Sequence, residues 1–213
     1  RPKYSHAWVV GGSRTTTGSA VLCSDPQTAV ANPSLLYEFH VSGKTFNARG
    51  VGVAGSPVVL IGWNERVAWG MTALGADQAD LFRLKAERGR YEIDGEWREF
   101  EVRRETIRVK DGKDEELEVR ETCFGPVVTR FAFVDQGEVA LRRVPVCETD
   151  RETIQGAIAM MRATDAASFL KALEGWRFPS ANVVFGDRAG AIGFSTVGAI
   201  PLRSPDSPEG GKA

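Results

Sequence analysis

The sequence predicts a layered α+β fold, because two hydrophobic periodicities occupy different parts of its 213 residues. Short apolar runs rich in β-branched residues occupy the first part, and alternating apolar and polar residues follow from 88 to 135. Between 150 and 176 the apolar residues recur at helical spacing, and the strand pattern returns after them. Strands, then helices, then strands indicate an α+β domain built in layers.

The first segment, residues 1–87, contains four apolar runs that we interpret as strands. Glycine, proline or threonine residues separate the runs, and their β-branched content favours strand over helix. The runs are residues 8–10, 20–23, 51–53 and 58–61.

The second segment, residues 88–148, alternates more clearly and predicts an antiparallel β meander inserted into the domain. Apolar side chains occupy every second position near Val102, Ile107 and Leu117, and Asp111-Gly112 is a hairpin turn signal. One solvated face of this meander would account for its many charges.

The third segment, residues 149–203, predicts two helices and a strand hairpin. Thr149 and Glu152 have capping-box spacing before the first helix. A second helix is expected from Thr164-Asp165, with three residues facing inward: Phe169, Leu170 and Leu173. Two short strands around a turn at 187–190 complete the segment, and residues 204–213 read as a disordered tail or a cut linker.

The composition excludes several classes of function. With 27 basic and 28 acidic residues the net charge is -1, which gives no reason to expect a nucleic-acid partner. No apolar run approaches the length of a membrane span. The three cysteines are widely spaced and do not form a metal-ligand pair.

Five segments occur in an order and spacing that resemble one family. They are residues 5–13, 25–27, 61–70, 71–80 and 179–203. Together they resemble the start of the β-subunit of penicillin acylases (penicillin amidases), N-terminal nucleophile hydrolases related to cephalosporin and acyl-homoserine-lactone acylases. The resemblance implies a partial αββα sandwich and a central fragment of a larger precursor. Its partners would be an α-subunit segment before this region and the remaining β-chain after it.

The resemblance makes Ser5 the nucleophile and its own α-amine the base. A serine hydroxyl needs a base to attack, and a free α-amine has a pKa of about 7.7–8.0. That amine exists only after cleavage between Tyr4 and Ser5, which in this family is autocatalytic. Tyr4 stands where relatives often have glycine, and a chain that keeps residues 1–4 is expected to be inactive.

Two further residues would stabilise the charge that develops on the carbonyl oxygen. By resemblance, the backbone N–H of Ala73 and the side-chain amide of Asn182 are the donors, and Gln27 orients the α-amine. From the residues alone, Asn182 also reads as a turn residue, Gln27 as a loop amide and Ala73 as ordinary packing.

The substrate and ion sites also come from the resemblance. Five residues fall where relatives contact substrate: Thr28, Leu60, Ile61, Met71 and Arg203. Asp77, the carbonyl of Ala79, and Asp80 resemble part of a structural calcium site, although Ca²⁺ takes 6–8 oxygen ligands. Core packing, a surface arginine and a solvated acidic loop are the alternative interpretations. The chemistry itself requires no cofactor.

The sequence therefore predicts an amide hydrolase that cleaves an acyl group from a small-molecule amine through an acyl-enzyme. The alternative is a catalytically silent domain of the same fold that serves binding or assembly. A serine hydrolase with a separate histidine base is disfavoured, because the chain has only His6 and His40 and no Gly-x-Ser-x-Gly motif. The resemblance also implies a periplasmic or secreted location.

Overall fold

The computed structural model describes residues 5–45, 47–132, 137–144 and 150–203 and contains two compact units. The first unit combines Arg1–Asp77 with Val144–Ile200, and the second combines Gln78–Arg143 with Pro201–Ala213. The predictions for Tyr4, Thr149 and residues 204–213 lie outside the described residues.

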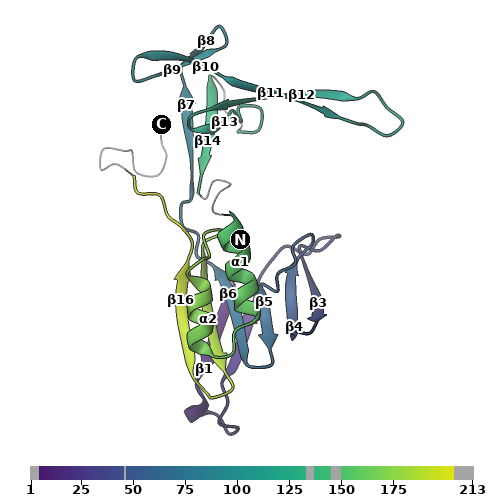
Figure 1. The fold of residues 1–213 in the computed structure, drawn as a ribbon, viewed down its shortest axis with the longest axis vertical. Coiled ribbons are helices and arrows are strands. Elements are labelled where there is room, and N and C mark those ends of the chain that lie inside the picture. The colour runs from purple at the N-terminus through teal and green to yellow at the C-terminus, as the bar shows by residue number, and fades with distance from the viewer. Residues whose placement is uncertain (1–4, 46, 133–136, 145–149, 204–213) are drawn as a thin grey trace. The chain divides into compact units, whose positions relative to one another are not determined.

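The first unit is built on a six-stranded antiparallel sheet (Figure 1). Its strand order is β16-β15-β6-β5-β4-β3, so β15 of the chain's last hairpin pairs with β6, which lies much earlier in the chain. The strands are β3 (Leu36–Ser42), β4 (Asn47–Val53), β5 (Ile61–Asn64), β6 (Val67–Ala73), β15 (Ala181–Asp187) and β16 (Ile192–Val197).

Helices α1 (Asp150–Met161) and α2 (Ala166–Leu173) cover one face of this sheet. Alternate residues of β6 and β15 point into the core between sheet and helices, which explains why Trp69 and Val183 are fully buried. Phe169 of α2 lies between Trp69 and Phe185, with ring centroids 5.6 and 4.9 Å apart. These aromatic side chains hold the helix layer on the sheet.

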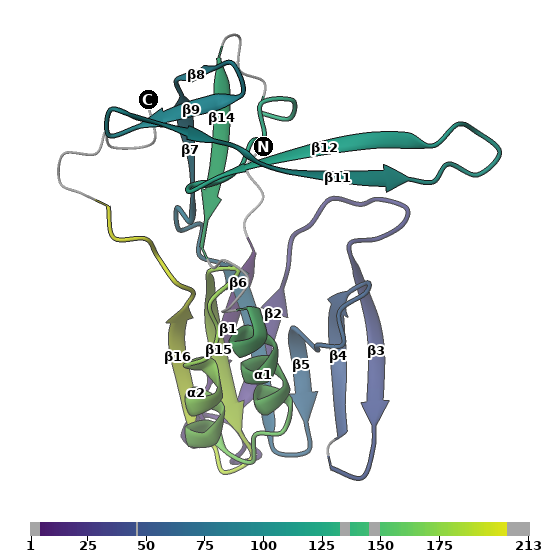
Figure 2. The same cartoon turned by 45° about the horizontal axis from the view of Figure 1, so that its top comes forward.

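The opposite face carries the hairpin of β1 (His6–Val10) and β2 (Val21–Asp25), seen behind the sheet in Figure 2. A short 3₁₀ helix, η1 (Gly12–Arg14), follows β1. The hairpin approaches closely because the sheet has glycines there: a Cβ on Gly70 would lie 2.7 Å from Ser24 Cβ. The unit therefore has three layers, with helices, sheet and hairpin in that order.

Two expectations for this unit are wrong in detail. Residues 58–60 are not a strand, because this run lies in the irregular connection before β5, where Val58 and Val59 are buried and Leu60 N–H donates to Val51 O. Leu170 does not face inward: it is 46% exposed, while Phe169 and Leu173 are buried. A helix of 8 residues buries one narrow stripe, and Leu170 lies beside it.

Helix α2 begins with the N-cap that the sequence indicates at Asp165. Its carboxylate accepts a hydrogen bond from Ser168 N at 2.7 Å, and Ser168 Oγ accepts one from Asp165 N, which completes a capping box. The bonds from Ser168 lower the pKa of Asp165 below its usual 3.8.

This lowered pKa predicts a pH effect on stability. The cap stabilises the fold above the unfolded pKa, and its contribution is lost as the pH falls through the lower, folded pKa. The variant Asp165→Asn keeps a capping side chain without titrating. Urea unfolding of both proteins between about pH 5 and pH 2 should show the wild type losing stability relative to the variant. Parallel curves would contradict this role.

The second unit contains three small antiparallel sheets around Leu84, Tyr91, Phe100 and Ala140. Strand β7 (Ala79–Leu84) pairs with β14 (Glu138–Arg143), and the unit begins at Gln78, whereas the predicted second segment begins at residue 88. The other strands are β8 (Ala86–Glu87), β9 (Arg90–Ile93), β10 (Glu96–Glu99), β11 (Glu101–Ile107), β12 (Glu115–Thr122) and β13 (Gly125–Pro126).

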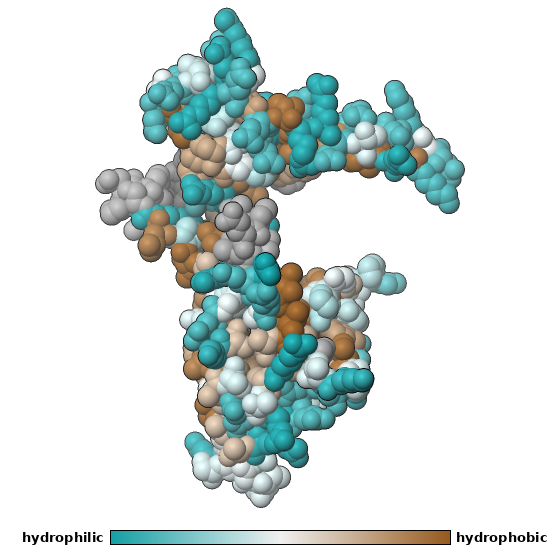
Figure 3. Space-filling model, in the orientation of Figure 1, coloured by the Kyte–Doolittle hydropathy of each residue, from teal (hydrophilic) through white to brown (hydrophobic). Residues whose placement is uncertain are grey.

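The β11–β12 hairpin is solvated more completely than expected. Its strands are antiparallel and lie on either side of the predicted turn, where Asp111 has a φ of 59°. All seven residues of β11 are exposed, so both faces of this strand meet solvent rather than one. Figure 3 shows the hairpin covered mainly by hydrophilic residues. No helix among the described residues is long and apolar enough to span a membrane.

Candidate active site

Ser5 lies directly before β1, where the hairpin brings Gln27 next to it. The register pairs His6 with Asp25, so Ser5 and the residues after Asp25 are neighbours. Gln27 N–H donates to Ser5 Oγ at 3.3 Å. The Gln27 side chain points along the same edge, with its Nε2 3.3 Å from Asp25 Oδ2 and from His6 Nδ1.

Asn182 and Ala73 lie on neighbouring strands, β15 and β6. Asn182 pairs with Thr72, and its Nδ2 donates to Thr72 Oγ1 at 3.3 Å. Leu74 N–H donates to Ser180 O at 3.3 Å, so Leu74 and Ser180 form a hydrogen-bonded pair. Because such pairs alternate along an antiparallel ladder, the N–H of Ala73 points away from β15.

The strand registers place Ser5 and Asn182 at the same end and on the same face of the sheet. Gly186 faces β1, since a Cβ added there would lie 3.1 Å from Val9 Cγ2. Gly70, which is close to Ser24, pairs in turn with Val184, and Ser24 pairs with Ala7. Moving along β15 from Gly186 to Val184 therefore follows the same direction as moving along β1 from Val9 to Ala7. Two more residues in that direction lead to Asn182 on β15 and to Ser5 on β1, so these two residues lie at the same end.

The predicted substrate residues do not all lie on this face. Ile61 lines a cavity of about 350 Å³ between β2 and the sheet, on the side of the hairpin. Met71 is one residue from Gly70 and from Thr72, so it points to the opposite face, where it is buried in the core under the helices. Leu60 and Ile61 both pack against that core as well, and Thr28 is exposed after the end of β2. The structure thus brings Ile61, but not Met71, to the face that holds Ser5.

Arg203 forms an ion pair with Asp80 inside the second unit. Its Nε and Nη2 both lie 3.0 Å from Asp80 Oδ1, and both side chains are less than a third exposed. A calcium ion needs several oxygen ligands, and the described residues contain no group of three or more acidic, histidine or cysteine side chains that could hold a metal. In the described part of the chain, Asp80 is already paired with the guanidinium of Arg203.

Sequence analysis missed two residues of the site, Thr72 and Ser24. Thr72 accepts the hydrogen bond of Asn182, and Ser24 lines the cavity beside Ile61. Strand alternation could have indicated both residues, because residues two apart on a strand point to the same face: Thr72 is two residues after Gly70, and Ser24 is two residues after Leu22. This alternation identifies a site residue only when the register between the strands is known.

Comparisons with known proteins identify the family to which this chain belongs. The family model described as penicillin amidase matches residues 2–212. An acyl-homoserine lactone acylase of Pseudomonas fluorescens is 32% identical over 204 residues, which are 93% of this chain and 25% of that protein. The penicillin G acylase of Escherichia coli is 30% identical over 222 residues, covering 95% of this chain and 24% of its own length.

A solved structure gives the same result for the fold. A thermostable penicillin G acylase from Alcaligenes faecalis matches with a TM-score of 0.81 at 28% identity, over 95% of this chain and 37% of that chain. The predicted α+β fold of the N-terminal nucleophile hydrolases is therefore confirmed. The chain spans about a quarter of the length of these curated relatives. The family match over almost every residue shows that this chain belongs to the penicillin amidase family.

Proposed function

We propose that the protein containing this chain hydrolyses an amide bond with Ser5 as its nucleophile. The observation that carries the proposal is the register, which puts Ser5, Asn182 and the N–H of Ala73 at one end of the two facing layers. Amide hydrolysis needs a nucleophile and fixed hydrogen-bond donors on one reacting carbonyl, and this end of the unit supplies both kinds of group.

In the proposed reaction, Ser5 Oγ attacks the carbonyl carbon while its proton passes to the α-amine of Ser5. The amide nitrogen takes that proton and leaves as the amine, and the acyl group remains as an ester on Ser5. Water then attacks the ester and releases the acid. Gln27 supports this chemistry, because its N–H contacts Ser5 Oγ and its side chain lies along the same edge.

The negative charge on the carbonyl oxygen would be held by Ala73 N–H and Asn182 Nδ2. The N–H of Ala73 points away from β15, as a donor to a substrate must. The hydroxyl of Thr72 holds the Asn182 amide in place before substrate binds. Donors fixed in advance need no reorganisation when the charge develops.

The proposal is tested first by the N-terminus of the mature protein. Intact mass and N-terminal sequencing of the expressed precursor should find a chain that begins at Ser5. The purified protein should then release amine from a panel of acyl amides that includes phenylacetyl and aliphatic acyl groups. A mature chain that retains residues before Ser5 and still hydrolyses amides would overturn the role of the α-amine.

Asn182→Ala is expected to lower kcat about 10²–10³-fold with a smaller change in KM, because it removes a donor to the transition state. The matched control is Thr72→Ala, which leaves the amide in place but unanchored and should cost less. Steady-state kinetics on the processed protein measure both. Equal, small losses in both variants would exclude Asn182 as an oxyanion donor.

We propose that the complete protein contains more than this chain, which spans about a quarter of the length of its curated relatives. We propose that an α-subunit segment and further β-chain complete the fold, and that any calcium site draws its remaining ligands from them. Arg203 is proposed to contact substrate, and export to the periplasm or medium follows from the family resemblance. A catalytically silent binding domain is the alternative, and the processed N-terminus separates the two.

A further inference from the structure

His6, Asp25 and Gln27 form a hydrogen-bonded group on the hairpin of β1 and β2, beside the proposed nucleophile. Gln27 Nε2 lies 3.3 Å from His6 Nδ1 and 3.3 Å from Asp25 Oδ2. His6 and Asp25 are directly opposite in the antiparallel register, so their side chains share one face of the hairpin. The reaction proposed above gives no role to either of these two titratable residues.

The two acceptors determine which way the amide of Gln27 points. An ionised carboxylate only accepts hydrogen bonds, and a neutral imidazole accepts at Nδ1 when its proton is on Nε2. The NH₂ group of Gln27 therefore faces His6 and Asp25, and Oε1 is turned away from both of them. Because one NH₂ group has two acceptors here, its orientation is better defined than a single contact would make it.

The same glutamine also contacts Ser5. Gln27 N–H donates to Ser5 Oγ at 3.3 Å, and Ser5 directly precedes His6 in the chain. The α-amine that processing would release on Ser5 therefore lies beside this group. An amine N–H needs an acceptor, and in an amide side chain only the carbonyl oxygen accepts. With its NH₂ group held by His6 and Asp25, Gln27 presents Oε1 as the atom that can accept from the amine.

Protonation of His6 would remove one of the two acceptors. Histidine changes charge between about pH 5 and pH 8, and both of its ring nitrogens then donate. Asp25 Oδ2 is 3.9 Å from His6 Nδ1, so the protonated ring would donate to this carboxylate and compete with the NH₂ group of Gln27. Two further titratable groups lie near His6 among the described residues: the α-amine of processed Ser5, and the thiol of Cys23 on the same face of β2, a kind of group that is neutral in this range.

We propose that His6 is a positioning residue which, with Asp25, holds the Gln27 amide so that Oε1 accepts from the α-amine of Ser5. Protonation of His6 releases this arrangement. The inference rests on the proposed function, because it takes that α-amine as the base. His6 contacts neither substrate nor the reacting atoms and acts through Gln27. The side chains of His6 and Asp25 are 65% and 63% exposed, so water competes for these contacts and the effect is that of one modest hydrogen bond.

The first test measures kcat for one chromogenic acyl amide on the processed, full-length protein. His6→Ala should lower kcat about three- to tenfold at about pH 8, with little change in KM. His6→Asn supplies an acceptor that does not titrate and should restore most of the lost kcat. In the Gln27→Ala background, His6→Ala should cost nothing further, because the first residue acts only through the second.

The pH profile separates positioning from a merely structural effect. Between about pH 8 and pH 5, the ratio of wild-type kcat to that of His6→Asn should fall about three- to tenfold, because only the wild type has a side chain at this position that protonates. His40→Asn, at the other histidine of the chain, is the matched control and should keep the wild-type profile. A constant ratio, or a full further loss from His6→Ala in the Gln27→Ala background, would contradict the proposal.

A readout without turnover keeps this inference apart from the proposed function. In protein labelled with ¹⁵N in its glutamine side chains, the NMR signal missing from Gln27→Ala identifies the amide of Gln27. That signal should shift between about pH 8 and pH 5 in the wild type and stay in place in His6→Asn. This shift without hydrolysis of any amide would support the positioning by His6 and refute the proposed function. Hydrolysis with a wild-type signal that does not shift would exclude the role of His6, even if His6→Ala did not fold.

Discussion

Replacing Ser5 by alanine is expected to lower amide hydrolysis at least about 10⁴-fold, the largest effect of any single change in this chain. The substitution removes the only atom that would form the acyl-enzyme, while the α-amine, the hairpin and the donors on β6 and β15 remain. It should also stop cleavage before residue 5, if the same hydroxyl performs both reactions. Active-site titration and the mass of the expressed protein measure the two effects.

A control for this experiment is Ser13→Ala, which removes an exposed serine hydroxyl from the same part of the chain. It should process and hydrolyse like the wild type. To keep processing out of the comparison, Ser5→Ala can be expressed with an N-terminus generated by an added protease. Residual activity within about 10-fold of the wild type in that protein would rule out Ser5 as the nucleophile.

Trp69→Ala is expected to destabilise the protein by about 3–5 kcal/mol, the largest stability effect of a single substitution. Trp69 is fully buried between sheet and helices, its Nε1 donates to Val59 O at 3.1 Å, and its ring packs against Phe169. The substitution leaves a cavity and an unpaired carbonyl in the same place. Urea unfolding followed by circular dichroism measures the loss.

Two other tryptophan substitutions show which part of this effect comes from burial. Trp69→Phe keeps most of the volume but loses the N–H, so it should cost clearly less than Trp69→Ala. Trp97→Ala, at a position that is 39% exposed on β10, should change the free energy of unfolding by less than about 1 kcal/mol. Equal costs at Trp69 and Trp97 would contradict the assignment of Trp69 to the core.

The sequence predicted the layers of this fold well, because periodicity and turn signals are local. The hairpin of β15 and β16 and the start of α2 at Asp165 were both visible in short stretches of sequence. The two wrong predictions, for residues 58–60 and for Leu170, have the same cause, which is packing between segments that are distant in the sequence. The apolar run at 58–60 reads as a strand, but it is apolar because Val58 and Val59 fill the core from a connection. Leu170 lies at the edge of the buried face of α2, and how wide that buried face is depends on the packing of the helix against the sheet.

The candidate site was predicted less completely. Ser5, Gln27 and Asn182 could be named because family-like segments surround them, and the registers put them at one end of the unit. Thr72 and Ser24 could not be named, since their roles depend on which strands face each other. Met71 points to the core under the helices because of the alternation of side chains along β6. The sequence around Met71 does not indicate which face of that strand the helices cover.

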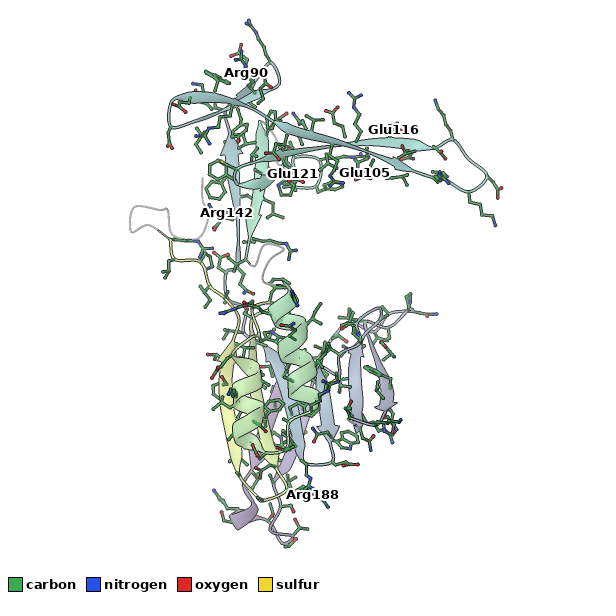
Figure 4. All side chains as sticks on the ribbon, viewed as in Figure 1. Arg90, Glu105, Glu116, Glu121, Arg142 and Arg188 are labelled. Carbon is green, nitrogen blue, oxygen red and sulfur yellow. The ribbon has the colours of Figure 1, made fainter. Side chains whose placement is uncertain are left out.

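The exposed hairpin of β11 and β12 has a consequence for how these molecules behave at high concentration. Beyond its pairing with β12, β11 has no strand neighbour among the described residues, so its outer backbone groups could accept a strand from another molecule. Charged side chains occupy the hairpin instead, with Arg104 next to Glu118 and Thr106 bonded to Glu116. Figure 4 shows Glu105, Glu116 and Glu121 spread along its length. A second hairpin docking there would have to strip water from these charges, which makes the most extended part of the unit a poor seed for aggregation.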